Sequence, residues 1–208
     1  ANHYLAILLL TLGRLDEAEI IFKKAIELKP DSDVYQNLAN TQIQLKKFEE
    51  AEINYRKVLE FDPDKLDIQY NLGNTLRELN RLDEAEVIYK KLIELKPDYF
   101  MAHNNLAITL RDLNKIDEAL KFYNNFKALK PDTDFLSGTI LHFKMQLNIW
   151  DDLHSELQEL IKKINIGEKF INPFPTLSLI DDPELHRKVA KIFSNHKSPK
   201  SNLFPKIS

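Results

Sequence analysis

The chain has 208 residues, of which 43% are hydrophobic and 29% charged, and its formal net charge is −3. These values are typical of a folded soluble protein, and the even spread of Lys and Arg argues against a protein that binds nucleic acid. The sequence has no cysteine, which excludes disulfides and thiolate metal sites and fits a cytoplasmic protein. Because no run of about 18 apolar residues occurs, we expect no membrane-spanning segment.

Four segments repeat the same residues about every 34 positions. Proline recurs near the end of each segment, at Pro30, Pro63, Pro97 and Pro131. Alanine recurs at Ala18, Ala51, Ala85 and Ala119, and leucine at Leu5, Leu38, Leu72 and Leu106. A period of this length is typical of stacked helix–turn–helix units. We therefore predict an all-α fold, an α-solenoid that forms a right-handed superhelix with a concave binding surface.

The first unit begins with the most apolar stretch of the chain, residues 4–10. We interpret it as a repeat helix rather than the core of a signal peptide, because no basic region precedes it and no small-residue cleavage site follows. Ile7 and Leu10 fall at positions that would face the groove or a neighbour on the N-terminal side. Since solenoid ends usually carry a polar cap, we expect either that earlier repeats were removed or that this helix packs on another chain, as in a homo-oligomer.

The third unit shows the expected hairpin most clearly. One helix is predicted from about Asp67 to Leu79 and a second from about Asp83 to Leu95. In the first helix, apolar residues at three- and four-residue spacing form one stripe that would be buried. Asn80 and Arg81 form the predicted turn, and Pro97 ends the second helix.

Small residues stand where the two helices of each unit would touch. The first helices supply Ala6, Ala39, Gly73 and Ala107, opposite the recurring alanines of the second helices. Aromatic residues would fill the larger gaps toward the next unit, at Phe22, Tyr55, Tyr89 and Tyr123. With these residues, positions 1–133 resemble four tetratricopeptide repeats, the first incomplete at its N-terminus. The resemblance implies a solenoid that binds protein, and it names no ligand.

The first helix of each unit would line the concave face, where it carries asparagines. One ridge contains Asn37, Asn71 and Asn105, and a second contains Asn40 and Asn74. Because an amide both donates and accepts, these side chains could hold the backbone of an extended peptide; the alternative is a role in packing between repeats. Further candidates for the peptide-binding site are Gln36, Tyr70, Arg77, Asn104, Arg111 and Asp112. Aromatic and guanidinium groups are common at binding hot spots, although a solvated helix face is the alternative for the charged residues.

After Asp134 the period continues but the residues change. Residues 134–166 are predicted to form a degenerate fifth repeat, in which Leu141 and Leu153 replace the small residues and Trp150 fills the extra space as a core anchor. Residues 167–196 are predicted to contain an extended Pro/Phe segment over 170–175, followed by a capping helix that begins at Asp182 and the proline after it. Residues 197–208 are predicted to be a linker or tail.

The same tail resembles a second family. The strings KMQLNIWDDLHSELQELI and NPFPTLSLIDDPELHRKVAKIF are similar to the junction in SPINDLY-type O-linked N-acetylglucosamine transferases. The matching residues are Trp150, Asp151, Pro173, Phe174, Pro175, Asp182 and Pro183. In that family an asparagine ladder holds acceptor peptides and a two-lobed glycosyltransferase domain follows the junction. The resemblance therefore implies a catalytic domain beyond Ser208, and none of its catalytic residues can be placed on this chain.

The chain itself offers no candidate for catalysis. Only four glycines occur, and none forms a phosphate-binding loop. The six histidines lack the spacing of a metal site; His142 and His154 could approach each other across a hairpin, but they have no third ligand. We therefore expect no catalytic residue, no metal and no cofactor.

Two functions fit these observations. The first is a peptide- or protein-binding module that recognises substrates or partners for a larger O-GlcNAc-transferase-like glycosyltransferase. The alternative is a free-standing scaffold that assembles a protein complex. Both predict an extended peptide or a protein in the concave groove, and in both this chain is not itself an enzyme.

Overall fold

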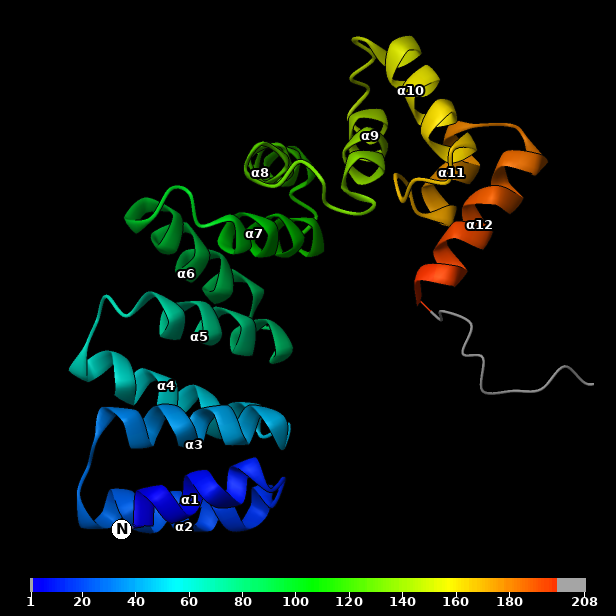
Figure 1. Cartoon of the computed structure of the whole chain (residues 1–208). Helices are drawn as coiled ribbons and strands as arrows, with labels where there is room; N and C mark the ends of the chain where they lie inside the picture. Colours follow the sequence, from blue (N-terminus) through cyan, green and yellow to red (C-terminus); the bar gives the residue numbers. More distant parts are fainter. Residues whose placement is uncertain (1, 198–208) are drawn as a thin grey trace, which may run out of the picture. The chain divides into compact units, whose positions relative to one another are not determined.

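The computed structural model describes residues 2–197, in which every regular element is a helix (Figure 1). In chain order the helices are α1 (Asn2–Thr11), α2 (Leu15–Leu28), α3 (Ser32–Gln44), α4 (Phe48–Phe61), α5 (Leu66–Glu78), α6 (Leu82–Leu95), α7 (Phe100–Asp112), α8 (Ile116–Leu129), α9 (Leu136–Gln146), α10 (Leu153–Asn165), α11 (Pro173–Leu179) and α12 (Pro183–Lys197). The predicted all-α solenoid of helical repeats is confirmed. The chain divides into two compact units, residues 1–115 and residues 116–208. Within residues 2–197, no helix is both long and apolar enough to cross a membrane.

The first unit is a stack of antiparallel helix pairs. Helix α1 packs on α2, α3 on α4 and α5 on α6, and successive pairs meet through α2–α3, α4–α5 and α6–α7. Figure 1 shows these helices as successive layers from α1 to α7. The hairpin predicted in the third unit agrees with α5 and α6 to within one residue at each end.

The helices of a pair approach closely because both carry a small residue at the contact. Ala18, Ala39 and Ala51 are all inaccessible to solvent. At Gly73 the approach is closer still, since an added Cβ would lie 2.8 Å from Cε1 of Tyr89. The predicted role of the small residues in helix packing therefore holds in this unit.

Each turn within a pair uses one residue in the left-handed backbone region. The φ angles are 73° at Gly13, 58° at Lys46 and 56° at Asn80. Glycine and asparagine adopt this region at little cost, so they are well suited to end a helix. In the third repeat the backbone N–H of Arg81 then bonds the carbonyl of Leu76 at 2.8 Å, which closes the turn predicted at Asn80 and Arg81.

The first helix differs from its prediction. Ile7 and Leu10 are partly buried and pack against the core formed by residues such as Leu9 and Phe22. The exposed large hydrophobic side chains of α1 are instead Tyr4, Leu5 and Leu8. The difference arises because α2 covers one side of α1. Since a helix turns by 100° per residue, residues two positions apart, such as Leu5 and Ile7, lie on nearly opposite sides.

The second unit has a core of its own, in which α11 packs on α9 and α12, and α10 packs on α12. Its buried members are Leu141, Leu160, Ile164, Ile171, Leu185 and Val189. Residues 169–171 lie against the start of α9, where the backbone N–H of Gly138 bonds the carbonyl of Phe170 at 2.9 Å. A Cβ at Gly138 would lie 2.6 Å from the Cα of Ile171, so only glycine allows this approach.

Two features of the second unit differ from the sequence prediction. Trp150 is predicted to anchor the core, but its side chain is 51% exposed, and Ile171 is among the buried residues that pack with Leu141 instead. The predicted extended segment is helical from Pro173 onward, because proline is tolerated in the first turn of a helix, where its missing N–H has no partner. The side chains of Leu153, Phe174 and Pro175 lie outside the described part of the chain, as does the predicted linker after Lys197. The predicted boundaries after residues 133, 166 and 196 remain predictions.

Candidate peptide-binding surface

The second asparagine ridge binds buried tyrosines of its own repeats. Tyr55 Oη donates to Asn40 Oδ1 at 2.6 Å, and Tyr89 Oη donates to Asn74 Oδ1 at 2.7 Å. Burial raises the pKa of both phenols above the usual range, so each keeps its proton and remains a donor. In this arrangement Asn40 and Asn74 fix the aromatic residues between the helices.

The first asparagine ridge connects neighbouring repeats. Asn105 Nδ2 donates to Asn74 Oδ1 at 2.6 Å and to Tyr70 Oη at 3.1 Å, and the side chain of Asn105 is buried. Asn37 Nδ2 lies 3.1 Å from His3 Nε2 of the preceding repeat. These contacts support the packing interpretation of Asn37 and Asn105 beside the predicted peptide contact.

Three other predicted residues are also held by neighbours. Gln36 Oε1 accepts a hydrogen bond from Lys65 Nζ at 2.7 Å. Asn104 Nδ2 donates to the side-chain oxygen of the next residue at 3.3 Å. Arg111 Nη2 donates to Asp112 Oδ1 at 2.8 Å. These polar groups already have partners within the fold, so a peptide would have to compete for them.

Asn71 and Arg77 line a groove between the second and third repeats. The groove has a volume of about 490 Å³ and is formed by the end of α3, the start of α4 and one side of α5. The side chain of Asn71 makes no hydrogen bond with any described residue, and the nearest carboxylate to Arg77 is Asp112, with Nη2 and Oδ2 3.9 Å apart. Within the described part of the chain, Arg77 Nε is buried without a hydrogen-bond partner. Lys46 and Glu78 also line the groove, whose lining residues therefore carry two cations and one anion.

A row of buried glutamates, which is not among the residues predicted from the sequence, links the repeats. Glu19, Glu52 and Glu86, here called the glutamate ladder, are 4%, 9% and 8% exposed. Each binds a cation four residues later in its own helix and a second cation at the start of the next repeat's second helix. The contacts between repeats are Lys47–Glu19 (2.6 Å), Arg81–Glu52 (2.6 Å) and Lys115–Glu86 (2.7 Å).

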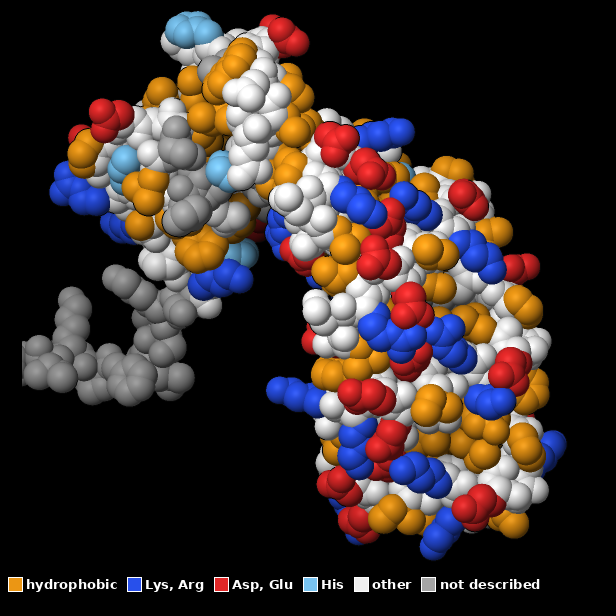
Figure 2. Space-filling model, turned by 180° about the vertical axis from the view of Figure 1, so that it is seen from behind, with side chains coloured by type: hydrophobic (Ala, Val, Ile, Leu, Met, Phe, Trp, Pro, Cys, Tyr) orange, Lys and Arg blue, Asp and Glu red, His pale blue; other side chains and the backbone are white. Residues whose placement is uncertain are grey.

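The ladder has a sequence signal that would have revealed it. Glutamate directly follows the recurring alanine in the first three units, and the partner cations recur at the same period. In the fourth unit Leu120 takes the glutamate's place, so the ladder ends there. Figure 2 shows basic and acidic side chains in mixed groups along one face of the repeats.

Ionisation of the ladder follows from its partners. Burial raises the pKa of Glu19, but hydrogen bonds from Lys23, Lys47 and Gln42 outweigh that effect and lower the pKa to about 2. The pKa of Glu86 is likewise lowered, because two lysines overcome the opposing effect of burial. Both carboxylates therefore remain charged at neutral pH.

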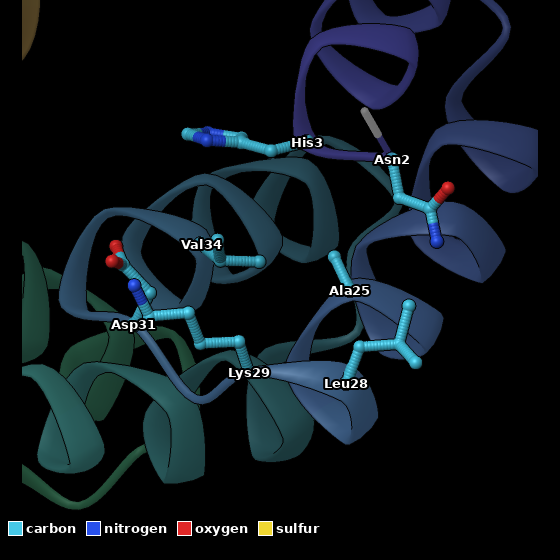
Figure 3. A pocket seen from close by; sticks show the side chains of 7 residues that line it. All are labelled: Asn2, His3, Ala25, Leu28, Lys29, Asp31 and Val34. Carbon is cyan, nitrogen blue, oxygen red and sulfur yellow. The ribbon is translucent and has the colours of Figure 1, made fainter.

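A second hollow, of about 300 Å³, lies at the start of the stack (Figure 3). It is lined by Asn2, His3, Ala25, Leu28, Lys29, Asp31 and Val34. Figure 3 shows Asn2 and His3 projecting in different directions from the start of α1. Asp31 Oδ1 accepts the backbone N–H of Asp33 at 3.0 Å, which caps α3. The carboxylate of this hollow thus serves the fold as a helix cap.

The described residues hold no cluster of three or more metal-ligating side chains. The two histidines predicted to approach each other form contacts within their own helices. His142 Nε2 lies 3.2 Å from Gln146, and His154 Nε2 lies 3.3 Å from Gln158. Burial lowers the pKa of His142, so this ring is neutral at physiological pH.

Comparisons with known proteins support the repeat assignment. Three family models, each described as a tetratricopeptide repeat, match residues 1–64, 42–103 and 88–121. No curated protein matches the chain. These findings give no support to the resemblance of the tail to SPINDLY-type transferases.

Several solved structures share the fold. A structure titled "Crystal structure of MamA protein" has a TM-score of 0.68 at 16% identity, with 98% of this chain and 96% of that chain covered. "MamA 41-end from Desulfovibrio magneticus RS-1" has a TM-score of 0.67 at 14% identity, with 77% and 92% covered. At such identities the likeness concerns the fold alone. The family matches, which together extend over residues 1–121, show that the chain belongs to the tetratricopeptide repeat family.

Proposed function

We propose that this chain is a protein-interaction scaffold that holds an extended peptide in the groove between its second and third repeats. Tetratricopeptide repeats are binding units, and their first helices form the concave side of a stack. The observation that carries the proposal is the groove itself, which combines about 490 Å³ of space with the side chain of Asn71, which makes no hydrogen bond with any described residue.

The roles of the asparagines differ within this proposal. Asn71 contacts the peptide backbone, because its amide has no other partner among the described residues and can both donate and accept. Arg77 attracts acidic groups of the peptide, although its Nη2 also forms a long ion pair with Asp112 Oδ2 at 3.9 Å. Asn40, Asn74 and Asn105 act indirectly by fixing the tyrosines and the neighbouring repeat.

A peptide selected on the chain would test the groove. A phage-displayed library of random twelve-residue peptides would supply the probe, and fluorescence anisotropy would measure its affinity for purified variants. We expect Asn71→Ala and Arg77→Gln each to weaken binding by about tenfold, as loss of a hydrogen bond or a charged contact does.

The matched control is Asn104→Ala, which removes an amide outside the groove. Circular dichroism would confirm that each variant keeps its helical content. Binding that is unchanged in both groove variants would exclude this groove as the peptide site.

A second function is favoured by one observation, the resemblance of residues 144–193 to the transferase junction. We propose on that basis that the repeats recognise acceptor proteins for an O-GlcNAc-transferase-like domain that would follow Ser208. The half-exposed Trp150 supports this proposal, because a tryptophan at the surface is suited to contact another domain. Sequencing the gene beyond Ser208 tests it, since a stop codon there would leave the free-standing scaffold as the function.

A further inference from the structure

The turn between α3 and α4 carries a lysine where the equivalent turns carry glycine or asparagine. One residue of each turn lies in the left-handed backbone region, and its φ angle is 73° at Gly13, 58° at Lys46, 56° at Asn80 and 60° at Asn114. Glycine and asparagine adopt this region at little cost, whereas it is less favourable for lysine, which has a Cβ and no short polar side chain. The second repeat therefore has a residue that the conformation of its turn does not favour.

The hydrogen bonds of this turn do not explain the lysine. The backbone N–H of Lys46 bonds the carbonyl of Ile43 at 3.0 Å, and in the third repeat the N–H of Asn80 bonds the carbonyl of Arg77 at 2.9 Å. The side chain of Lys46 is exposed and forms no ion pair with any residue that the structure describes. Since the turn does not depend on the charge of this lysine, that charge is available to a ligand.

Arg77 adds a second cation to the groove that Lys46 lines. Its side chain is 25% exposed, and its ion pair with Asp112 is long, with 3.9 Å between Nη2 and Oδ2. Burial raises the pKa of Tyr89 and the charge of Arg77 lowers it, so the guanidinium lies near that phenol. Because Nε has no hydrogen-bond partner among the described residues, the donors of this guanidinium are not all used within the fold.

The charges on the groove are suited to a ligand with a single negative charge. Lys46 and Arg77 are positive and Glu78 is negative, so the lining has one more cation than anions. Within the described part of the chain Glu78 forms no ion pair with either cation, which leaves both able to contact a ligand. A carboxylate would neutralise the lining, whereas a phosphate group, with a charge of about −1.5 to −2, would make it negative.

This pair of cations occurs at one junction of the repeats. At the preceding junction the two positions hold Gly13 and Ile43, and at the following junction they hold Asn80 and Arg111. Neither of these junctions combines two cations. The groove between the second and third repeats therefore has a charge pattern that its neighbours in the stack lack.

We propose that Lys46 and Arg77 bind the carboxylate of one glutamate or aspartate side chain in a peptide segment of a partner protein. This assignment rests on the proposed function of the groove, because it concerns a side chain of the same peptide whose backbone contacts Asn71. The planar guanidinium of Arg77 orients the carboxylate, and the flexible side chain of Lys46 reaches it as a point charge. Two cations from adjacent repeats therefore select an acidic residue at one fixed position of the peptide.

Selection of displayed peptides would test this site. A phage library of random twelve-residue peptides, selected on the full chain, should return sequences with glutamate or aspartate at one fixed position. A selected peptide would be synthesised with an amidated C-terminus, so that no terminal carboxylate takes part, and again with the corresponding amide in place of the acidic residue. Fluorescence anisotropy should show about tenfold weaker binding of the amide variant to the unchanged chain.

The contribution of Lys46 follows from combining a change in the peptide with a change in the protein. With Lys46→Asn protein, the tenfold difference between the two peptides should shrink about fivefold, since an exposed ion pair contributes up to about that factor. Lys24→Gln, which removes an exposed lysine outside the groove, should leave the difference unchanged. Because asparagine suits the left-handed turn, Lys46→Asn should also raise the midpoint of thermal unfolding by about 2 °C. A variant that is more stable and binds less well has not lost affinity through unfolding.

The outcomes that would overturn the proposal can be told apart. Selected peptides without a fixed acidic position, or an equal difference between the two peptides in the unchanged chain and in Lys46→Asn, would exclude a carboxylate at this pair. If Asn71→Ala still weakens binding in that case, the groove remains the peptide site and only this assignment fails. Binding that is unchanged in both Asn71→Ala and Arg77→Gln would remove the groove itself, and this assignment with it. A peptide with phosphoserine in place of the acidic residue should not bind more tightly, and tighter binding would replace the carboxylate with a phosphate group.

Discussion

In each of the two units, two segments of the chain approach closely at a glycine. In one unit the glycine meets a side chain, and in the other it meets backbone. Gly73 faces the ring of Tyr89 in the same hairpin. Gly138 faces the backbone of Ile171, in a loop that has no counterpart in the repeats. The ring of Tyr89, although bonded through its hydroxyl to Asn74, can shift by a few tenths of an ångström, whereas a packed backbone cannot do so without moving its hydrogen bonds. The third repeat therefore meets its glycine with a side chain, and the second unit meets its glycine with backbone.

The largest expected effect is that of Gly138→Ala. The added methyl group would lie 2.6 Å from a backbone atom, so we expect a loss of about 3 kcal/mol, at the upper end of overpacking costs. Gly73→Ala is the matched variant, since its methyl group would meet only a side chain and alanine gains about 1 kcal/mol of helix propensity. We expect its net effect to be within about 1 kcal/mol of zero. Urea unfolding followed by circular dichroism would measure both, and equal losses would contradict the difference between the units.

The two units should also differ in how their stability depends on pH, because the glutamate ladder is confined to the first three repeats. The folded pKa of Glu19 is about 2, below its usual value of 4.5. The stability that Glu19 contributes is therefore fully present above about pH 4.5 and is lost as the pH falls toward 2. Linkage gives this contribution a size on the order of 3 kcal/mol.

Glu19→Gln should remove that pH-dependent contribution. At pH 7 the variant is expected to be less stable than the unchanged chain, and the difference should shrink at lower pH. Glu17→Gln serves as the control, since its exposed pair with Arg14 contributes little to stability. The free energy of unfolding of the unchanged chain and of Glu19→Gln would be compared between pH 7 and 3. If the two curves run parallel, the ladder does not stabilise the stack.

The sequence predicted the repeats well because each helix boundary depends on local residues that recur. It could not predict the surroundings of Asn105, since Tyr70 and Asn74 lie in the preceding repeat and meet it only after stacking. The prediction for Trp150 was wrong for a different reason. Its size suggested a core position, but Ile171, which comes later in the chain and outside the repeat period, is one of the residues buried against Leu141.

The smallest expected effects separate the two roles of the asparagine ridge. Asn105→Ala removes the hydrogen bonds to Asn74 and Tyr70 and leaves buried polar groups unpaired, so we expect a loss of about 1–2 kcal/mol. Asn71→Ala removes no side-chain bond with any described residue and should change stability by less than about 0.5 kcal/mol. Thermal unfolding of the two variants, combined with the affinity of the selected peptide, gives the decisive pattern. We expect Asn105→Ala to lower stability and Asn71→Ala to lower affinity for the peptide without lowering stability. That result would show that one ridge contains both a structural and a binding asparagine. If both variants lose stability equally, Asn71 is a packing residue and the groove lacks its central contact.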